Sequence, residues 1–321
     1  MQRSERSAAA ATHAVAWISH PACARHFMGE GHPESPRRLQ VIEDRLRATG
    51  LLDFVRRVEA PAASEDQLLR VHTREHVARV LHADVRCGPI WHDADTAQGE
   101  HSAQAALHAA GAGIKGVELA LAGAAELAFC AVRPPGHHAE RARAMGFCLF
   151  NNVAVAAAHA LALGLNRVAI LDFDLHYGNG TADIFAGDER VWLYSTYQHP
   201  LYPYWSGAPH AANLVDVPLA PYAGGEAFRH GVNVHWQPAL ERQRPELILV
   251  SAGFDAHAED PLGDLRLAYD DFAWIGERIR HWAQVWCRGR AVALLEGGYA
   301  LHALARSVES FLRPFLHDGP P

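Results

Sequence analysis

The sequence predicts a single-domain α/β protein with three layers, in which helices cover both faces of a mainly parallel sheet. Short apolar runs alternate with longer amphipathic or Ala-rich segments, which is the pattern of strands joined by helices. No linker rich in Pro, Gly or Ser divides the 321 residues, so we expect one large domain. Residues 1–12 are expected to form a flexible N-terminal tail, and residues 13–321 the domain itself.

Apolar runs without polar alternation indicate strands that are buried on both faces. We expect strands over residues 13–20, 127–132, 168–171, 191–195, 247–251 and 291–295. Helical patterns occupy residues 35–49, 67–82, 102–121, 151–163, 270–286 and 301–312. Residues 196–225 are rich in Pro, Tyr and Gly, and a connection of that length is typical of a functional loop.

Composition excludes several classes of protein. The net charge of -7 argues against a nucleic-acid binder, and no apolar run approaches the twenty residues of a membrane span. Five cysteines without paired spacing indicate reduced thiols, and the N-terminus lacks the apolar core of a signal peptide. We therefore expect a cytoplasmic protein. Lys115 is the only lysine and precedes Gly116, which excludes a Gly-Lys-Ser/Thr phosphate loop. The strong preference for Arg over Lys indicates a bacterial source.

Chemically reactive side chains follow four of the expected strands, each at its carboxyl end. They are His137 and His138; Asp172, Asp174 and His176; Asp255; and Tyr299. Any one of these groups alone could be a turn residue, a helix cap or a solvated charge. Because the carboxyl ends of parallel strands meet at one edge of a sheet, where α/β proteins bind ligands, we expect a single site.

These residues have the chemistry of a metal-dependent hydrolase. Asp174, His176 and Asp255, here called the metal triad, offer the three N/O ligands of an open catalytic zinc site. Such a metal polarises a carbonyl and lowers the pKa of a bound water. His137 and His138 supply acid–base groups with pKa values near neutrality. The set predicts hydrolysis of an amide or ester without a covalent intermediate.

Three further residues could support that chemistry. Asp172 and Asn179 are placed to accept hydrogen bonds from the histidines and so orient them. Tyr299, in a Gly-Gly-Tyr turn, could donate a hydrogen bond to a developing oxyanion.

Five motifs in order resemble the zinc-dependent histone deacetylase family, with the closest fit to its class II branch and to bacterial acetylpolyamine amidohydrolases. The motifs are 133–140 (RPPGHHAE), 146–152 (GFCLFNN), 172–181 (DFDLHYGNGT), 251–255 (SAGFD) and 296–299 (EGGY). The resemblance extends from about residue 13 to about residue 312 and includes 31–36 (GHPESP). It implies an arginase/deacetylase-like fold and zinc at the metal triad.

The resemblance also implies a role for each catalytic residue. His138 would be the general base and then the general acid, with His137 as its electrostatic partner. Asp172 would orient His137, Asn179 would face His138, and Tyr299 would polarise the acyl carbonyl.

Structural potassium is a further implication of the resemblance. The first ion would bind the side chains of Asp172 and Ser195 and the backbone oxygens of Asp174, His176 and Thr196. A second would lie near Phe185, Asp188 and Val191.

Phe147 and Tyr202 resemble the aromatic walls of an acyl-lysine tunnel, and Gly146 would allow the substrate to approach closely. Tyr177 stands where the family usually has a second histidine, so we expect altered packing there. Tyr202 replaces a common Phe, and the segment 203–205 (PYW) replaces a Pro-Gly-Thr type of turn, which predicts a bulkier rim. Leu262 occupies the gatekeeper position, where the polyamine-selective branch carries a Glu that pairs with a substrate cation.

We therefore expect a zinc-dependent deacetylase that acts on acyl-lysine or a related acylated amine. Leu262 favours acyl-lysine, but acetylpolyamines and a homo-oligomeric state stay open. A two-metal ureohydrolase would instead need His257 and Asp260 as ligands of a second metal. A third alternative is a weakly active module that binds acyl-lysine, which the presence of Tyr299 disfavours.

Overall fold

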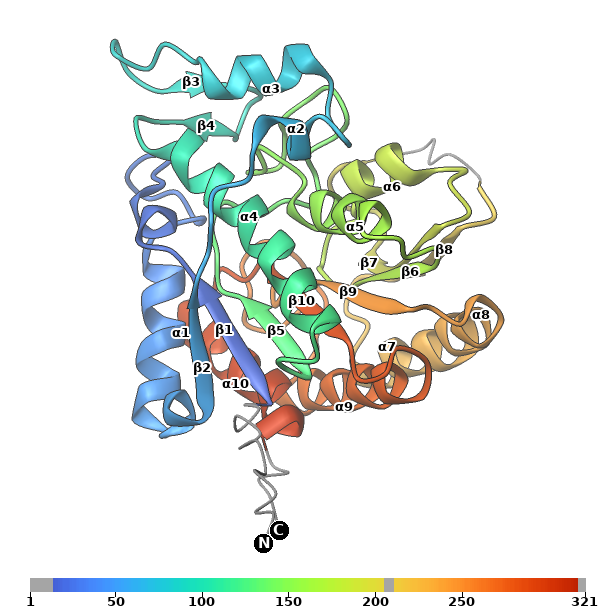
Figure 1. Ribbon diagram of the computed structural model, residues 1–321. Coiled ribbons are helices and arrows are strands. Elements are labelled where there is room, and N and C mark those ends of the chain that lie inside the picture. The colour runs from blue at the N-terminus through green and yellow to red at the C-terminus, as the bar shows by residue number, and fades with distance from the viewer. Residues whose placement is uncertain (1–13, 205–210, 317–321) are drawn as a thin grey trace, which may run out of the picture.

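The fold is built around an eight-stranded sheet in which every strand is parallel to its neighbours (Figure 1). The computed structural model of the chain describes residues 14–204 and 211–316, so the expected N-terminal tail lies outside the described residues. The strand order is β2-β1-β5-β10-β9-β6-β7-β8. The strands are β1 (Val15–Ser19), β2 (Val55–Glu59), β5 (Leu127–Cys130), β6 (Val168–Asp172), β7 (Val191–Gln198), β8 (Leu214–Leu219), β9 (Leu247–Ala252) and β10 (Ala291–Leu295).

Helices cover both faces of the sheet, which confirms the predicted three-layer, single-domain α/β fold. One layer contains α1 (Arg37–Ala48), α7 (Gly225–Gly231), α8 (Gln237–Gln243), α9 (Tyr269–Trp286) and α10 (Leu301–Leu316). The other contains α2 (Glu65–Leu68), α3 (Arg74–Leu81), α4 (Ser102–Leu121), α5 (Asn152–Ala162) and α6 (Asn179–Phe185).

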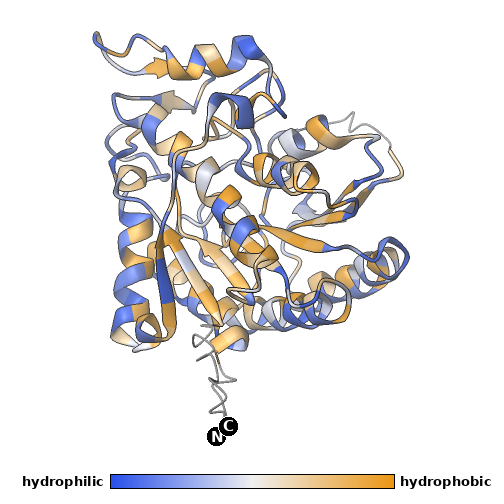
Figure 2. Ribbon diagram, in the orientation of Figure 1, coloured by the Kyte–Doolittle hydropathy of each residue, from blue (hydrophilic) through white to orange (hydrophobic). Residues whose placement is uncertain are grey.

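Alternation along the strands divides the core between the two layers. In β6, Val168 and Ile170 join the core under α4 and α5, whereas Ala169 and Leu171 join the core under α9 and α10. The central strands are therefore apolar on both faces, as Figure 2 shows by their largely hydrophobic colouring.

The two edge strands were not predicted. β2 reads Val-Arg-Arg-Val-Glu and is mostly exposed, so it lacks the apolar run that identifies a central strand. β8 lies within residues 196–225, which were expected to be irregular, and carries Pro218, a residue that edge strands tolerate. β7 also continues into this stretch, to Gln198.

Other helix and strand boundaries differ from the predicted ones for local reasons. The helix expected over 67–82 is divided into α2 and α3, because the Thr73 hydroxyl accepts a hydrogen bond from the His76 amide (3.2 Å) and starts a new helix. A short antiparallel pair, β3 (Ile90–Trp91) and β4 (Ala97–Gln98), was also not predicted. Within the described ranges, no helix combines the length and apolarity needed to cross a membrane.

Candidate active site

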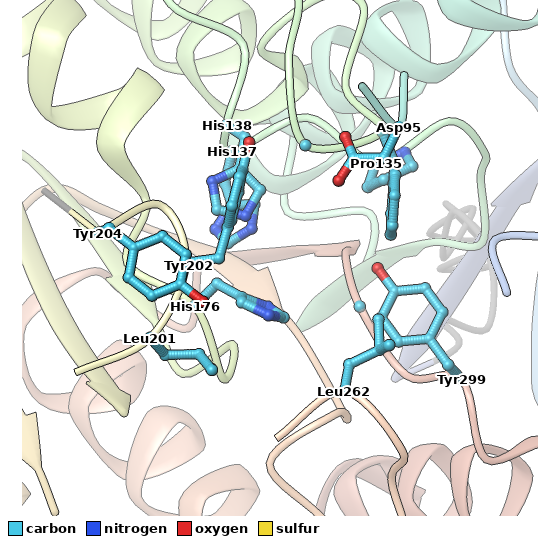
Figure 3. A pocket seen from close by; sticks show the side chains of 13 residues that line it. Asp95, Pro135, His137, His138, His176, Leu201, Tyr202, Tyr204, Leu262 and Tyr299 are labelled. Atoms are coloured by element: carbon cyan, nitrogen blue, oxygen red, sulfur yellow. The ribbon is translucent and has the colours of Figure 1, made fainter. Parts of the chain in front are cut away.

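The reactive side chains that follow four predicted strands meet at the carboxyl edge of the sheet. β5, β10, β9 and β6 are successive neighbours, so the segments that leave them lie side by side. Figure 3 shows His137, His138, His176 and Tyr299 around one pocket, whose volume is about 260 Å³. The predicted convergence of these four segments is therefore present in the structure.

Aromatic rings form the walls of this pocket. The Tyr202 ring meets the His138 ring edge-to-face at 5.1 Å between centroids, and the Phe147 ring meets the Tyr299 ring at 5.8 Å. Gly146 has φ +56°, and a Cβ there would lie 2.5 Å from the His138 ring, so a larger residue would displace the histidine. The pocket is also lined by Asp95, Pro135, Leu201, Tyr204, Leu262 and Gly297.

The metal triad is buried and compact. The candidate ligand atoms of Asp174, His176 and Asp255 all lie within 4.8 Å of one another. His176 Nδ1 is 3.2 Å from Asp174 Oδ1 and 3.2 Å from Asp255 Oδ2. The Gly297 amide donates to Asp174 Oδ2 and the Leu175 amide to Asp255 Oδ1, each at 2.9 Å. Backbone donors thus fix both carboxylates with an oxygen toward the imidazole.

The electrostatics of the triad favour a positive charge. Burial alone would lower the pKa of His176, but hydrogen bonds to Asp174 and Asp255 raise this pKa to about 9. Burial raises the pKa of Asp255, and the neighbouring Asp174 carboxylate raises it further. Two carboxylates and one imidazole are ligands that zinc accepts, so the residues fit a divalent ion.

The two adjacent histidines have different partners. His137 Nδ1 lies 3.0 Å from Asp172 Oδ2, and His138 Nδ1 lies 2.6 Å from Asn179 Oδ1. Because an amide oxygen only accepts, it holds the proton of His138 on Nδ1 and leaves Nε2 as an acceptor when the ring is neutral. The two ring centroids are 4.0 Å apart.

These partners separate the two pKa values. Burial opposes charge on His137, but Asp174 and Asp172 outweigh it and raise the pKa of His137 well above its ordinary value. Burial, then His137 and His176, lower the pKa of His138 well below its ordinary value. The pair therefore combines one charged imidazole with one neutral imidazole, the arrangement that divides acid and base roles.

Glu140 was not assigned a role from the sequence, although it closes the 133–140 motif. Its carboxylate accepts a hydrogen bond from Asn179 Nδ2 (2.9 Å). Because the amide nitrogen is held by Glu140, the amide oxygen of Asn179 must face His138. Arg143 in turn donates two hydrogen bonds to Glu140, at 3.0 and 3.1 Å.

Tyr299 is also held by two residues, Asp260 and Arg38, to which the sequence analysis assigned no role in supporting it. Asp260 Oδ2 accepts from the Tyr299 amide (2.7 Å) and from the next amide along the chain. The Arg38 guanidinium lies 4.9 Å from the centroid of the Tyr299 ring and donates to the Gly298 carbonyl (2.7 Å). Figure 3 shows the hydroxyl of Tyr299 directed into the pocket. Arg38 is fully buried and pairs with Glu34.

The two potassium sites implied by the resemblance differ in whether their oxygen atoms already have hydrogen-bond partners. Asp172 pairs with Ser195 in the β6–β7 register, and the Ser195 hydroxyl is buried without a hydrogen-bond partner among the described residues. An unsatisfied buried oxygen beside a carboxylate fits a cation. The carbonyls of Phe185, Asp188 and Val191 do converge, but onto the side-chain amide of Asn213.

The ligands of the ureohydrolase alternative are occupied elsewhere. His257 Nδ1 accepts from the Glu259 amide (3.1 Å), and Asp260 accepts the backbone amides behind Tyr299. In residues 14–204 and 211–316 the metal triad is the one cluster of three or more candidate ligands.

Two sequence departures can be placed. Tyr177 is buried and packs on the Tyr197 ring (4.7 Å between centroids). Tyr204 lines the pocket and is exposed at the rim, whereas Trp205 lies outside the described residues.

A buried carboxylate–imidazole triad at the carboxyl edge of a parallel sheet defines an α/β protein with a candidate metal site. The family model of the histone deacetylase domain matches residues 32–315, so the chain belongs to the histone deacetylase family. The family makes it a deacetylase or amidohydrolase, that is, a hydrolase of amides.

Similar proteins come from distant organisms. A probable deacetylase of Archaeoglobus fulgidus is 37% identical over 88% of this chain and 81% of its own length. A histone deacetylase-like amidohydrolase of Pseudomonas aeruginosa is 38% identical over 88% of this chain and 75% of its length. The human polyamine deacetylase HDAC10 is 36% identical over 90% of this chain, which matches 45% of that protein.

A solved structure supports the fold. The crystal structure of the HDA15 HD domain superposes with a TM-score of 0.89 at 31% identity, over 97% of this chain and 90% of that one.

Metal content tests the triad. We expect wild-type protein to retain one divalent ion per chain after dialysis against metal-free buffer, measured by inductively coupled plasma mass spectrometry. Asp255→Asn removes a charged ligand, so its metal affinity should fall by more than the ~10–100-fold that loss of an outer hydrogen-bond partner causes. His257→Asn is the control and should retain one ion. Two ions per wild-type chain, or equal loss in the control, would contradict the single-ion site.

Proposed function

We propose that the chain is a zinc-dependent amidohydrolase that removes acetyl or other short acyl groups from the amine of acyl-lysine or a related acylated amine. The observation that carries this proposal is the buried metal triad beside an aromatic-walled pocket, with a neutral His138 and the Tyr299 hydroxyl facing the same space. The pocket suits an unbranched acyl-amine better than a bulky substrate, because rings line it.

The metal triad would hold the zinc ion. When bound, zinc supplies Lewis acidity that polarises the acyl carbonyl and makes a water molecule more acidic. Asp174 and Asp255 contribute negative charge, and the backbone amides behind them keep the ligand oxygens in place. His176 contributes Nδ1, which already faces both carboxylates.

His138 is the proposed general base. Its low pKa keeps it neutral near pH 7, and the Asn179 oxygen keeps Nε2 free to accept a proton from the attacking water. The same nitrogen then donates that proton to the leaving amine. His137 stays protonated beside Asp172, so its charge stabilises the developing negative charge without taking part in the transfer.

Tyr299 is the proposed donor to the acyl oxygen. Burial raises the pKa of Tyr299 well above its ordinary value, so the phenol stays protonated. Its backbone is held by Asp260 and its ring by Arg38, so the hydroxyl is held in place before the substrate binds. An activity-poor binding module would not need this support, which favours an enzyme.

We further propose a potassium ion at the Asp172 and Ser195 side chains, with the backbone oxygens of Asp174, His176 and Thr196. Support comes from the unsatisfied Ser195 hydroxyl next to the buried Asp172 carboxylate. A monovalent cation there would offset negative charge behind the metal triad.

The proposed substrate class follows from the side chains of Leu262 and Asp95, which line the pocket. Leu262 is apolar and cannot pair with a second amine, which favours acyl-lysine over acetylpolyamines. The polyamine alternative keeps some support, because the Asp95 carboxylate lines the pocket and one relative is named a polyamine deacetylase. A cytoplasmic location and independence of nucleic acid remain proposals that rest on cysteine content and charge.

Replacement of Tyr299 by Phe tests the catalytic proposal. Loss of the hydroxyl removes one donor to the developing oxyanion, so kcat on a fluorogenic acetyl-lysine peptide should fall by about 10²–10³-fold. Metal content should stay at the wild-type level. Tyr204→Phe, which removes a hydroxyl at the exposed rim, is the matched control and should keep wild-type kcat. Full activity in Tyr299→Phe would refute its role as the donor.

A substrate panel tests the gatekeeper. We expect wild-type kcat/KM to be higher on acetyl-lysine peptides than on N8-acetylspermidine. Leu262→Glu adds a carboxylate at the pocket, so it should shift this ratio toward acetylspermidine by roughly tenfold, the effect of about 1.4 kcal/mol. Leu262→Gln controls for size and polarity and should shift the ratio far less. Acetylspermidine as the better wild-type substrate would show that Leu262 does not set the preference.

A further inference from the structure

Three backbone carbonyls between α6 and β7 converge on one point. They belong to Phe185, at the end of α6, to Asp188, and to Val191, at the start of β7. At their common centre lies the side-chain nitrogen of Asn213, whose two N–H bonds are shared among the three oxygens at N···O distances of 2.7, 3.2 and 2.8 Å, respectively. These three carbonyls are here called the carbonyl ring. The family resemblance implied a second potassium ion near the same three residues.

Further hydrogen bonds to the side-chain oxygen and to the backbone carbonyl of Asn213 fix the residue in this position. Its side-chain oxygen accepts a hydrogen bond from the Gly187 amide (3.0 Å), and its backbone carbonyl accepts from the Leu193 amide (2.9 Å). The residue is 2% exposed. A flipped amide would set an oxygen against three carbonyl oxygens and an NH2 group against an N–H, so the observed orientation is the only one that satisfies every contact.

A cation and the Asn213 amide cannot occupy the carbonyl ring together. Rings of carbonyl oxygens bind potassium by replacing its hydration shell, which requires the centre of the ring to be open. Here the amide protons fill that centre and complement the same carbonyl dipoles. The residues therefore do not fit the second potassium ion that the resemblance implied.

We propose that Asn213 is a built-in replacement for that cation, so the 185–191 segment is closed by the chain itself and needs no potassium. This segment joins α6, which begins with Asn179, to β7, which carries Ser195. Asn213 immediately precedes β8, so its side-chain amide connects the start of β8 to the segment between α6 and β7 by hydrogen bonds. Both α6 and β7 contribute residues to the candidate active site. The proposal does not rest on the hydrolase activity, because occupancy of the ring is independent of turnover.

Thallous ion, a heavy substitute for potassium, tests the proposal directly. Crystals of the wild-type protein soaked in thallous acetate should show no anomalous peak inside the carbonyl ring, whether or not the Asp172–Ser195 site takes up the ion. A peak within the ring, with the Asn213 side chain displaced from it, would overturn the proposal. The wild-type result stands even if no variant folds.

Variants of Asn213 test in solution whether potassium can replace the side-chain amide in the carbonyl ring. Asn213→Ala should lower Tm by roughly 5 °C in choline chloride, because buried carbonyls lose a donor. Potassium chloride at equal ionic strength should restore part of this loss, and the restoration should exceed any potassium effect on the wild type. Asn213→Asp, which has the same shape but repels the carbonyls, should depend on potassium still more strongly.

Asn166→Ala, at an exposed position, is the control and should respond to potassium as the wild type does. Equal potassium responses in the wild type and both Asn213 variants would show that the amide does not stand in for a cation. Neither experiment measures turnover, so a failed hydrolase assay leaves its outcome unchanged.

Discussion

Negative charge concentrated at the carboxyl edge of the central strands is the constraint on which the rest of the site depends. Asp172, Asp174, Asp255 and Glu296 are all at most 1% exposed, and each leaves or follows one of three adjacent strands. Buried carboxylates are costly unless charge or hydrogen bonds compensate them. The fold supplies backbone amides to all four, and it brings the imidazoles of His137 and His176 against them.

That compensation also creates the chemistry. The carboxylates stabilise positive charge at His137 and at the metal triad, and this charge then keeps the neighbouring His138 neutral. The Glu296 carboxylate accepts the Gly136 and His137 amides, so the turn that presents both histidines is fixed by the same buried charge. Burial raises the pKa of Glu296 to about 7, and the charges of Asp172 and Asp174 act in the same direction. The proposed acid–base catalysis and the proposed metal binding thus both follow from one electrostatic arrangement.

Much of this could be predicted from the sequence, because central parallel strands are apolar on both faces and end at one edge. That rule alone predicts that His138, Asp174, Asp255 and Tyr299 lie together at one edge of the sheet. The edge strands β2 and β8 escaped prediction, since exposed strands carry polar residues and Pro218. Hydrogen-bond partners that are far apart in the sequence were not predicted either.

The missed partners share a physical reason. The Arg38 guanidinium contacts the Tyr299 ring, although the two residues are far apart in the sequence. Asn213 donates to the Phe185 carbonyl of the carbonyl ring from a separate segment of the chain. A single side chain that binds backbone atoms leaves no periodic pattern, so only the folded chain reveals it. The motif at 133–140 did contain Glu140, but its contact with Asn179 required the two segments to be placed.

Anomalous diffraction at the zinc absorption edge, from crystals grown with one equivalent of zinc, tests the central claim most directly. The account predicts one peak within bonding distance of a carboxylate oxygen of Asp174, Nδ1 of His176 and a carboxylate oxygen of Asp255, with the Tyr299 hydroxyl facing it across the pocket. An empty triad under these conditions, or an ion held instead by His257 and Asp260, would contradict it.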